Sequence, residues 1–560
     1  MIPLADDYAT VYDRFRWNVP ERYNMAHDAC DRHATDPGRL ALVVEGEDGG
    51  TREWTFHQVR QLANRCANLL ESCGVEPGDR VAILLGQAVE TAVANIACFK
   101  CGAVSMPLFT KFGLADLEFR LADGAARVLV TDMENFARIA PVRDRLPHLE
   151  TVFTVDGESE GARDFWKELE RGSKRYQTRA TAAEDPAVLL YTSGTTGSPK
   201  GVLHAQRVLL GHIPGMDFAN DYLGQPGDRL WSPADWAWIG GLFDILMPAW
   251  YYGLPVVAAP RADFDPEEAL DILARHRIRN TLLLPTMLKL MAQVPAGRHD
   301  VRLRSVFTGG EPVGAEVMAW AEGTLGASVN EIYGQTECNL VAGGCSRLLE
   351  RRPGAIGVPI PGHVVDIVDD DGELAAPGGT GHIAIRQPDP VAMLSYWRRP
   401  DADAEKVVNG WLLTGDVGHK DDEGYLWFTG RADDVITRDG EQFGPGGIEE
   451  CLTAHPDVAL AAAVGVPDSG RGEVVKAYVV VRDGASAGSG LRGVLLARAR
   501  RELPANAAPR ELEFVGELPR TTTGKIMRRE LRRRELDRQR EMLRERREAS
   551  DGTDTGCPEG

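Results

Sequence analysis

Short apolar runs alternate along the chain with longer segments in which apolar residues recur at helical spacing. Residues 80–85 (RVAILL) form one such run, whereas residues 54–73 and 89–101 on either side of it have the helical pattern. Short apolar runs predict buried strands, and the longer periodic segments predict helices. Strands that alternate with helices favour an α/β fold with largely parallel sheets.

The same pattern continues to about residue 430, and a smaller α/β segment follows residue 434. Further strands are predicted in the first part at residues 128–131, 152–155, 255–259, 281–284 and 305–308. In the second part, strands are predicted at 458–466, 474–481 and 513–515, and helices at 448–455 and 491–502. We therefore expect a large domain over residues 1–432, a small α/β domain over 433–545 and a polar tail over 546–560.

Residues 236–260 are apolar apart from a single charged residue, Asp244. Glycines, internal prolines and this aspartate interrupt the stretch, so it is a poor candidate for a membrane span. It predicts buried core or the wall of a pocket instead.

Cys98 and Cys101 have the CxxC spacing that also occurs in metal and redox sites. No second ligand pair or histidine cluster accompanies them, and the same spacing fits one face of a buried helix, which is the reading we prefer. The chain has nine scattered cysteines. This odd number argues against a disulfide framework and favours a reducing cytoplasm.

The formal net charge of -20 argues against a general nucleic-acid-binding protein, because affinity for phosphates needs a basic face. The N-terminal residues are acidic where a targeting peptide would be basic and then apolar. Residues 528–548 contain ten arginines, but six acidic residues are mixed with them. This pattern favours a solvated helix with internal ion pairs over an RNA-binding segment.

Residues 191–201 (YTSGTTGSPKG) follow an apolar strand predicted at 187–190. Glycines let a backbone approach a polyphosphate closely, hydroxyl groups donate hydrogen bonds, and a lysine supplies positive charge. The spacing is not that of a Walker A loop. The candidate phosphate-binding residues are Thr192, Ser193, Gly194, Thr195, Thr196, Gly197, Ser198, Pro199 and Lys200. The alternative is a polar surface loop.

This loop resembles the phosphate-loop signature of the adenylate-forming (AMP-binding) superfamily. Five more stretches resemble the family's motifs in the same order: TGGEP (308–312), EIYGQTE (331–337), LLTGDVG (412–418), GRADD (430–434) and PRTTTGKIM (519–527). Within the superfamily the chain is most similar to medium-chain, AMP-forming acyl-CoA synthetases. The resemblance implies a large N-terminal domain with parallel-rich sheets and a small, mobile C-terminal domain.

The resemblance also implies the reaction. A carboxylate attacks the α-phosphate of ATP to give an acyl-adenylate and pyrophosphate, and the thiol of coenzyme A then displaces AMP. ATP, Mg²⁺ and coenzyme A are the implied cofactors and co-substrates, and small molecules are the implied partners. A carboxylic acid is already ionised near neutral pH, so the first step needs positioning and charge stabilisation and no activated nucleophile.

By resemblance, Lys525 reaches the α-phosphate and the carboxylate, Asp416 and Arg431 contact the ribose or phosphate, and Asp433 is the hinge. Thr192 and Glu337 are the implied Mg²⁺ ligands, a pair of hard oxygen donors. The remaining implied nucleotide-binding residues are Gly310, Glu311, Pro312, Glu331, Ile332, Tyr333, Gly334, Gln335 and Thr336.

The acyl pocket is expected beside Gly309 and Gly334, with walls from Trp236, Trp238 and Ile239. Acetate-specific relatives have larger side chains at the two glycine positions. Their absence predicts an acid larger than acetate: medium-chain, branched or aromatic. The alternative is that both glycines serve backbone geometry without any effect on the pocket.

Residues 435–450 (VITRDGEQFGPGGIEE) depart from the family pattern, which resembles VITSAGYRIGPFEIE. Glu441 and Gln442 replace a Tyr-Arg pair, and Gly446 and Gly447 replace Phe-Glu. Glutamine cannot supply the charge of the arginine, and Glu441 adds a negative charge near an anionic ligand. We therefore expect weakened coenzyme A contacts at 438–442, which include Asp439 and Gly440, and slow thioester formation.

Three hypotheses remain open from the sequence. The first is a working acyl-CoA synthetase, and the second is an adenylating ligase with a carrier protein or an amine as acceptor. The third is a degenerate family member that binds nucleotide or a partner without efficient turnover. The sequence names neither the acid nor the oligomeric state.

Overall fold

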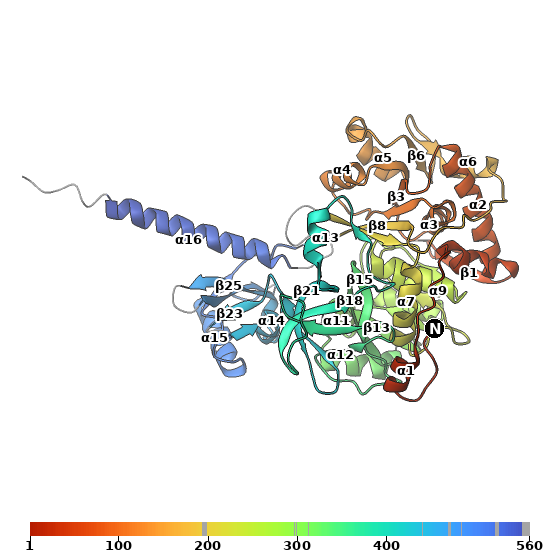
Figure 1. Cartoon of the computed structure of the whole chain (residues 1–560). Coiled ribbons are helices and arrows are strands. Elements are labelled where there is room, and N and C mark those ends of the chain that lie inside the picture. The colour runs from red at the N-terminus through yellow and green to blue at the C-terminus, as the bar shows by residue number, and fades with distance from the viewer. Residues whose placement is uncertain are drawn as a thin grey trace, which may run out of the picture.

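The chain folds into a large body and a smaller C-terminal unit from which one long helix extends (Figure 1). The computed structural model describes residues 1–46, 48–192, 199–295, 297, 299–311, 313–438, 441–468, 472–482, 484–520 and 526–551. None of the helices in these residues is long and apolar enough to cross a membrane.

The first sheet of the large body has the strand order β19-β9-β8-β4-β3-β5-β6-β7 and is parallel from β8 to β7. Its strands are β3 (Arg80–Leu84), β4 (Val104–Pro107), β5 (Ala126–Thr131), β6 (Thr151–Thr154), β7 (Arg163–Asp164), β8 (Pro186–Thr192), β9 (Lys200–Ala205) and β19 (Ser395–Tyr396). The helices of this region are α2 (Phe56–Ser72), α3 (Val89–Cys101), α4 (Leu114–Asp123), α5 (Met133–Ile139) and α6 (Phe165–Arg171). Strand and helix alternate here as the sequence predicts.

The second sheet begins with a parallel set of strands. These are β1 (Leu40–Glu45), β10 (Leu230–Trp231), β11 (Val256–Ala258), β12 (Asn280–Leu282), β13 (Ser305–Gly309) and β14 (Val329–Gln335), with β2 (Thr51–Thr55) antiparallel at the edge. The helices of this region are α10 (Pro266–Arg275), α11 (Pro285–Met291) and α12 (Ala315–Trp320).

From residue 338 to residue 431 the strands of this sheet pair in antiparallel fashion. They are β15 (Cys338–Gly343), β16 (Ala355–Pro359), β17 (Val365–Val368), β18 (Thr380–Arg386), β21 (Trp411–Lys420) and β22 (Leu426–Arg431), with β20 (Val407–Val408) beside β21. The prediction that parallel α/β alternation continues to residue 430 is therefore wrong for this stretch. Antiparallel pairing needs no crossover helix. The helix of this stretch, α13 (Pro400–Lys406), lies in the connection between β18 and β21, which still pair in antiparallel fashion.

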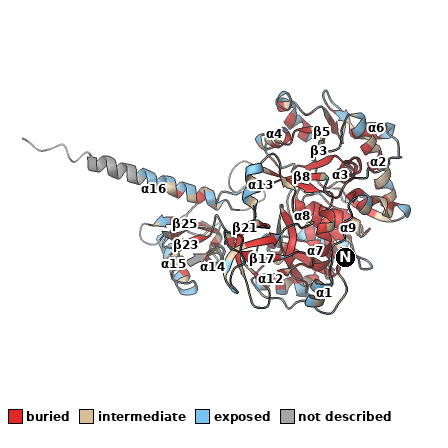
Figure 2. Ribbon diagram, in the orientation of Figure 1, coloured by how far each residue is buried: buried red, intermediate tan, exposed pale blue. Residues whose placement is uncertain are grey.

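Buried helices lie between the two sheets (Figure 2). They are α7 (Val208–Ala219), α8 (Ile239–Gly241), the π-helical turn η4 (Leu242–Leu246) and α9 (Met247–Tyr251). Trp236 and Trp250 are among the largest fully buried side chains. The prediction that residues 236–260 form buried core and not a membrane span is confirmed.

Helix α3 occupies the predicted residues, and nearly every side chain on it is buried. Cys98 and Cys101 lie within the hydrophobic core, where burial raises the pKa of both thiols. The helix ends at Gly102, whose φ of +76° is the left-handed conformation that favours glycine. The CxxC spacing therefore belongs to a buried helix, as preferred from the sequence.

The C-terminal unit is built on a sheet with the order β24-β23-β26-β25, to which β27 adds in parallel. Its strands are β23 (Ile436–Arg438), β24 (Glu441–Phe443), β25 (Val458–Asp468), β26 (Gly472–Val481) and β27 (Glu511–Phe514), and its helices are α14 (Gly446–Thr453), α15 (Ser489–Glu502) and α16 (Arg528–Asp551). The predicted domain boundary at 432/433 falls in the turn between β22 and β23.

Helix α16 is docked through its first turns and then extends away from the sheet (Figure 1). Glu535 is buried and accepts hydrogen bonds from Lys476 and Tyr478, and Arg528 pairs with Glu449. Ion pairs within the helix, such as Arg534 with Glu530, agree with the predicted pattern. The helix is therefore part of the small unit's core at one end and carries exposed side chains as far as Glu541.

Candidate active site

The strands β8 and β9 form the base of the candidate phosphate loop. Tyr191 is paired with Gly201, and Thr192 with Lys200, so the two ends of the loop lie side by side. The Thr192 hydroxyl lies 3.4 Å from the carbonyl oxygen of Lys200, to which it donates. The loop residues Ser193, Gly194, Thr195, Thr196, Gly197 and Ser198 lie outside the described residues.

A cluster of polar contacts around Asp123 holds the base of the loop in place. Tyr191 donates from its hydroxyl to Asp123 Oδ2 at 2.7 Å, and Arg399 pairs with Asp123 Oδ1 at 2.9 Å. The indole nitrogen of Trp397 donates to the Asp123 carbonyl at 2.9 Å. These partners come from α4 and from the segment after β19, so no local sequence signal connects them with the loop.

Tyr396 links the loop lysine to the expected metal ligand. Its hydroxyl donates to Glu337 Oε1 at 2.6 Å, and Lys200 Nζ lies 5.1 Å from the centre of its ring. Burial, followed by the charge of Glu337, raises the pKa of the Tyr396 hydroxyl, so it remains a hydrogen-bond donor. Thr192, Lys200 and Glu337 thus belong to one cluster, and the sequence did not identify Tyr396 as its link.

Asp416 and Arg431 face each other across β21 and β22. The two residues are in register, and Arg431 Nη1 donates to Asp416 Oδ1 at 2.8 Å. Tyr333 donates from its hydroxyl to Asp416 Oδ2 at 2.6 Å. Burial alone would lower the pKa of Arg431, but the charge of Asp416 outweighs it and raises that pKa. The carboxylate is therefore held in place by a charge and a hydroxyl.

The turn that carries Glu337 is fixed from two sides. His204 on β9 donates from Nε2 to the carbonyl oxygen of Thr336 at 2.7 Å. Lys406 donates to Gln335 Oε1 at 3.3 Å and to the Thr414 carbonyl at 3.2 Å. The turn that carries Glu337 is therefore connected to β9 through His204 and to Asp416 through Gln335. Neither His204 nor Lys406 was predicted from the sequence.

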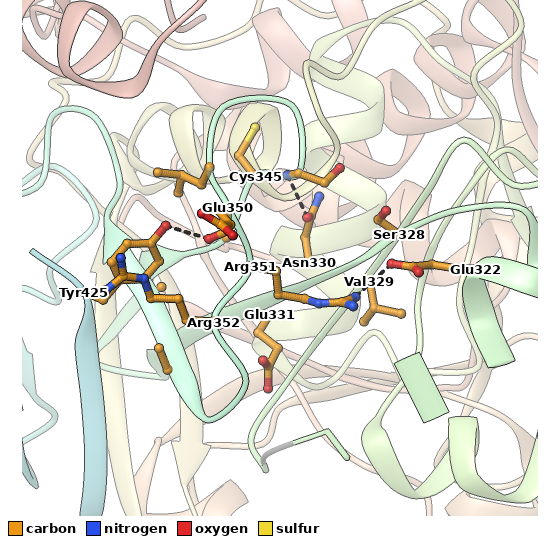
Figure 3. A pocket seen from close by; sticks show the side chains of 15 residues that line it. Glu322, Ser328, Val329, Asn330, Glu331, Cys345, Glu350, Arg351, Arg352 and Tyr425 are labelled. Carbon is orange, nitrogen blue, oxygen red and sulfur yellow. Dashed lines mark hydrogen bonds and ion pairs between the residues drawn. The ribbon is translucent and has the colours of Figure 1, made fainter. Parts of the chain in front are cut away.

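Further expected nucleotide-binding residues lie directly after β13 and along β14. Gly310 has a φ of +90°, which favours glycine, and Pro312 lies outside the described residues. Glu331 Oε1 accepts a hydrogen bond from the Val313 amide at 3.2 Å, and burial raises the pKa of Glu331. A cavity of about 270 Å³ runs along β14 and the loop after β15, with Glu331 and Tyr425 in its wall (Figure 3).

The two glycines of the expected acyl pocket are held by close backbone approaches. A Cβ atom at Gly334 would lie 2.5 Å from the Leu340 nitrogen, and one at Gly309 would lie 2.7 Å from the Ile332 carbonyl oxygen. Each glycine therefore meets a backbone requirement, the alternative considered from the sequence. Trp236 and Ile239 are buried, and the ring of Trp238 packs over Gly240.

The hinge region is a tight turn. The amides of Asp434 and Val435 both donate to the Arg431 carbonyl, at 2.9 Å and 2.8 Å. A Cβ atom at Gly444 would overlap the carbonyl oxygen of Thr429, so this glycine cannot be replaced without moving the chain. Asp433, the expected hinge residue, is exposed in this turn. Lys525, Asp439 and Gly440 lie outside the described residues.

Two family models match the chain. The model of the AMP-binding enzyme matches residues 30–397, and that of the AMP-binding enzyme C-terminal domain matches residues 447–525. The acetyl-coenzyme A synthetase of Bacillus subtilis is 33% identical over 95% of each chain. The mitochondrial acyl-coenzyme A synthetase ACSM4 of Rattus norvegicus is 32% identical over 96% of this chain and 94% of that protein.

Solved structures of acyl-CoA ligases are also similar to this chain over most of its length. The anthranilate CoA ligase AuaEII, in complex with anthranoyl-AMP, has a TM-score of 0.80 at 28% identity and covers 92% of this chain and 97% of its own. The two family models together span both the large body and the small unit. The chain therefore belongs to the AMP-binding enzyme family.

Proposed function

We propose that the chain is an AMP-forming acyl-CoA synthetase that activates a carboxylic acid larger than acetate. The observation that carries the proposal is the juxtaposition of Lys200, Tyr396 and Glu337 at the base of the phosphate loop, connected to the Asp416–Arg431 pair. Relatives that match nearly the whole chain are acyl-CoA synthetases, which supports the same reaction class.

The first half-reaction requires an anionic carboxylate to approach an anionic triphosphate. Lys200 and Arg431 are two cations that the described residues contribute, and Asp416 offers its carboxylate to the ribose hydroxyls. Positioning and charge stabilisation of this kind account for most of the catalysis of phosphoryl chemistry. Lys525 contributes a further cation from the C-terminal domain in this proposal.

Thr192 and Glu337 would hold Mg²⁺, which neutralises phosphate charge when it is bound. The residues fit this ion, because both offer hard oxygen atoms. Tyr396 occupies one lone pair of Glu337 Oε1, and the second carboxylate oxygen has no hydrogen bond from any described residue. The tyrosine therefore orients the carboxylate without consuming its capacity to bind a cation.

The proposal that the acid is larger than acetate rests on Gly309 and Gly334, where acetate-specific relatives have larger side chains. The names of the similar proteins cover both a small acid, acetate, and an aromatic one, anthranilate. The close backbone approaches at both glycines favour local geometry as one reason for their presence. The walls at Trp236 and Ile239 remain large and apolar, which suits an alkyl or aromatic chain.

A second candidate function is an adenylating ligase with an amine as acceptor. It is favoured by the replacement of the family's Tyr-Arg pair with Glu441-Gln442 on the expected coenzyme A side. The amide bond synthetase McbA from Marinactinospora thermotolerans is similar over 91% of this chain, with a TM-score of 0.76 at 29% identity.

Release of AMP and pyrophosphate would be followed with ATP, Mg²⁺ and a panel of C3–C10 and aromatic acids, with and without coenzyme A. Thioester formation supports the synthetase. Acid-dependent pyrophosphate exchange without thioester supports the ligase with another acceptor. The absence of both reactions with every acid would overturn the two candidates and leave a binding protein.

A further inference from the structure

Asp244 is an isolated titratable group in the core of the large body. It lies on η4, is 2% exposed, and is the single charged residue of the apolar stretch 236–260. Burial raises the pKa of its carboxyl well above the usual range, and no cation offsets this effect. A carboxyl without a charged partner is expensive to bury, and such groups are enriched at functional sites.

Asn339 is the hydrogen-bond partner of this carboxyl. Its side-chain nitrogen donates to Asp244 Oδ1 at 2.7 Å and to His212 Nε2 at 3.2 Å. His212 in turn donates from Nδ1 to the Val208 carbonyl at 2.7 Å, which leaves Nε2 as the acceptor. Both amide protons of Asn339 are therefore engaged, and the three side chains have fixed orientations.

Two acceptor atoms of this cluster are left over. Among the residues that the structure describes, none donates a hydrogen bond to Asp244 Oδ2 or to the side-chain oxygen of Asn339. The neighbours are apolar: Phe243 packs on the His212 ring at 5.2 Å, and Leu340 is fully buried. Two adjacent oxygen atoms without a donor among the described residues can accept hydrogen bonds from a bound group.

The cluster lies against the turn that carries Glu337. Asn339 follows Glu337 by two residues, and a Cβ atom at Gly334 would lie 2.7 Å from the Asn339 Cα. Asp244 follows Ile239 by five residues in the continuous segment α8–η4. Asn339 therefore adjoins Gly334, a member of the expected acyl pocket, and Asp244 lies on the helical segment that begins at Ile239, another member.

We propose that Asp244 and Asn339 recognise a hydrogen-bond-donating group, an amino or a hydroxyl group, on the acyl part of the acid. This inference rests on the proposed function and narrows its substrate class. A donor on the acid would satisfy Asp244 Oδ2 and the Asn339 oxygen together. A methyl group at the same place would leave both unsatisfied, and sites built for hydrogen bonding discriminate strongly against such analogues.

A purely structural role makes a different prediction. If Asp244 served only to orient Asn339, its replacement would lower stability and the rates with all acids in equal proportion. Asp217 is the matched control, because it is a buried carboxyl that accepts hydrogen bonds from Tyr252 and from the Ile2 amide. It takes no part in the expected pocket.

The test compares acids that differ only in one group: 3-aminobenzoate, 3-hydroxybenzoate and 3-methylbenzoate, and 6-aminohexanoate, 6-hydroxyhexanoate and heptanoate. The readout is kcat/KM for acid-dependent pyrophosphate exchange. The wild-type enzyme is expected to prefer the amino or the hydroxyl member of one series over its methyl member by about 10- to 100-fold. Comparison of the amino member with the hydroxyl member of each series shows which of the two donor groups is preferred.

Asp244→Leu is expected to abolish or reverse this preference, and Asp217→Asn is expected to preserve it. Asp244→Asn provides a second variant of nearly unchanged shape, and thermal melts establish that each variant folds. Equal use of all members by the wild type, or an equal loss with all acids in the Asp244 variants, would overturn the inference alone. The absence of exchange with every acid would overturn the proposed function and this inference with it.

Discussion

Arg431 Nη1 lies 2.8 Å from Asp416 Oδ1, so two residues expected to hold the same nucleotide are already paired with each other. Tyr333 donates to the second oxygen of the same carboxylate. The Asp416 carboxylate is thus oriented by two side chains, and ribose hydroxyls would join it in that orientation. Preorganisation of this kind lowers the entropy that binding loses.

Replacement of Asp416 with alanine is expected to raise the KM for ATP by about 10- to 100-fold, because hydrogen bonds to a charged group contribute about 1.5–3 kcal/mol. The variant also leaves the half-buried Arg431 without its partner. Tyr333→Phe keeps the carboxylate and removes one donor, so it should have a smaller effect. Initial rates at varied ATP concentration measure both, and an unchanged KM in the alanine variant would remove Asp416 from the site.

Replacement of Lys525 with alanine is expected to slow adenylation by about 10²- to 10³-fold, the usual effect of losing one electrostatic contact to the transition state. Thioester formation from supplied acyl-adenylate should change little, because the lysine is expected to act in the first half-reaction. Lys289→Ala, on the exposed side of α11, is the matched control. Equal losses in both half-reactions would contradict this assignment.

Gly334→Ala is expected to lower the free energy of unfolding by about 1–3 kcal/mol, as overpacking does elsewhere. The added Cβ atom would approach the Leu340 nitrogen to 2.5 Å. Gly323→Ala, where nothing lies within 4 Å of the added atom, should be neutral or stabilising. Thermal melts of the two variants test this. If Gly334→Ala melts like the wild type, the close approach does not constrain this position.

Gly334→Trp examines the acyl pocket at the same residue. The comparison with acetate-specific relatives predicts a shift in preference toward acetate or propionate. The backbone approach predicts in addition that the variant loses stability. The ratio of kcat/KM for acetate to that for octanoate, in the folded fraction, is the measurement. An unchanged ratio would count against Gly334 as a determinant of acid size.

Gly447→Ala is expected to stabilise the C-terminal unit by about 0.5–1 kcal/mol, because glycine is a poor residue in a helix. Gly447 lies in the first turn of α14, and a Cβ atom there meets nothing within 4 Å. Gly444→Ala should have the opposite sign, since its Cβ atom would overlap the Thr429 carbonyl. Melting curves that move in the same direction for both variants would refute the contrast.

Buried histidines should make the protein less stable in acid. Burial lowers the pKa of His204 to about 4 and that of His212 to about 3. Below the unfolded pKa of about 6.5, the unfolded chain takes up these protons while the folded chain does not. Each histidine therefore removes about 1.4 kcal/mol of stability per pH unit as the pH falls from 6.5 toward the folded pKa.

Two buried carboxyl groups have the opposite influence on stability as the pH falls. Burial raises the pKa of Asp217 and of Asp235 to about 6, so the folded state takes up these protons first and gains stability as the pH falls. His204→Gln isolates the histidine contribution, because glutamine can still donate to Thr336 but does not titrate. Its melting midpoint should fall less steeply than that of the wild type between pH 6.5 and 4. Parallel slopes would show that His204 is not neutral in the folded state.

Local patterns predicted the elements that are buried on all sides or strongly periodic. Helix α3 and the strands β3, β5 and β6 lie where the sequence placed them, within a residue or two. The antiparallel region from residue 338 to 431 was misjudged, because a short apolar run shows that a strand is buried but not which strand it pairs with.

The residues of the candidate site also fall into a predicted group and a missed group. Motif resemblance identified Thr192, Glu337, Asp416 and Arg431, and the structure places them in two connected clusters. Tyr396 and His204 escaped notice, since each acts through a partner more than fifty residues away. Such contacts are set by tertiary packing and leave no spacing pattern in the chain.

Helix α16 is anchored at its base to the small unit and points away from the large body (Figure 1). Its 24 residues span about 36 Å. Any rotation about the turn at 431–435 would therefore be magnified at its far end. A fluorophore at the exposed Glu541, paired with one on the large body, would convert small changes of domain angle into large changes of distance. The length of α16 therefore makes changes of domain angle measurable as changes of distance in single molecules.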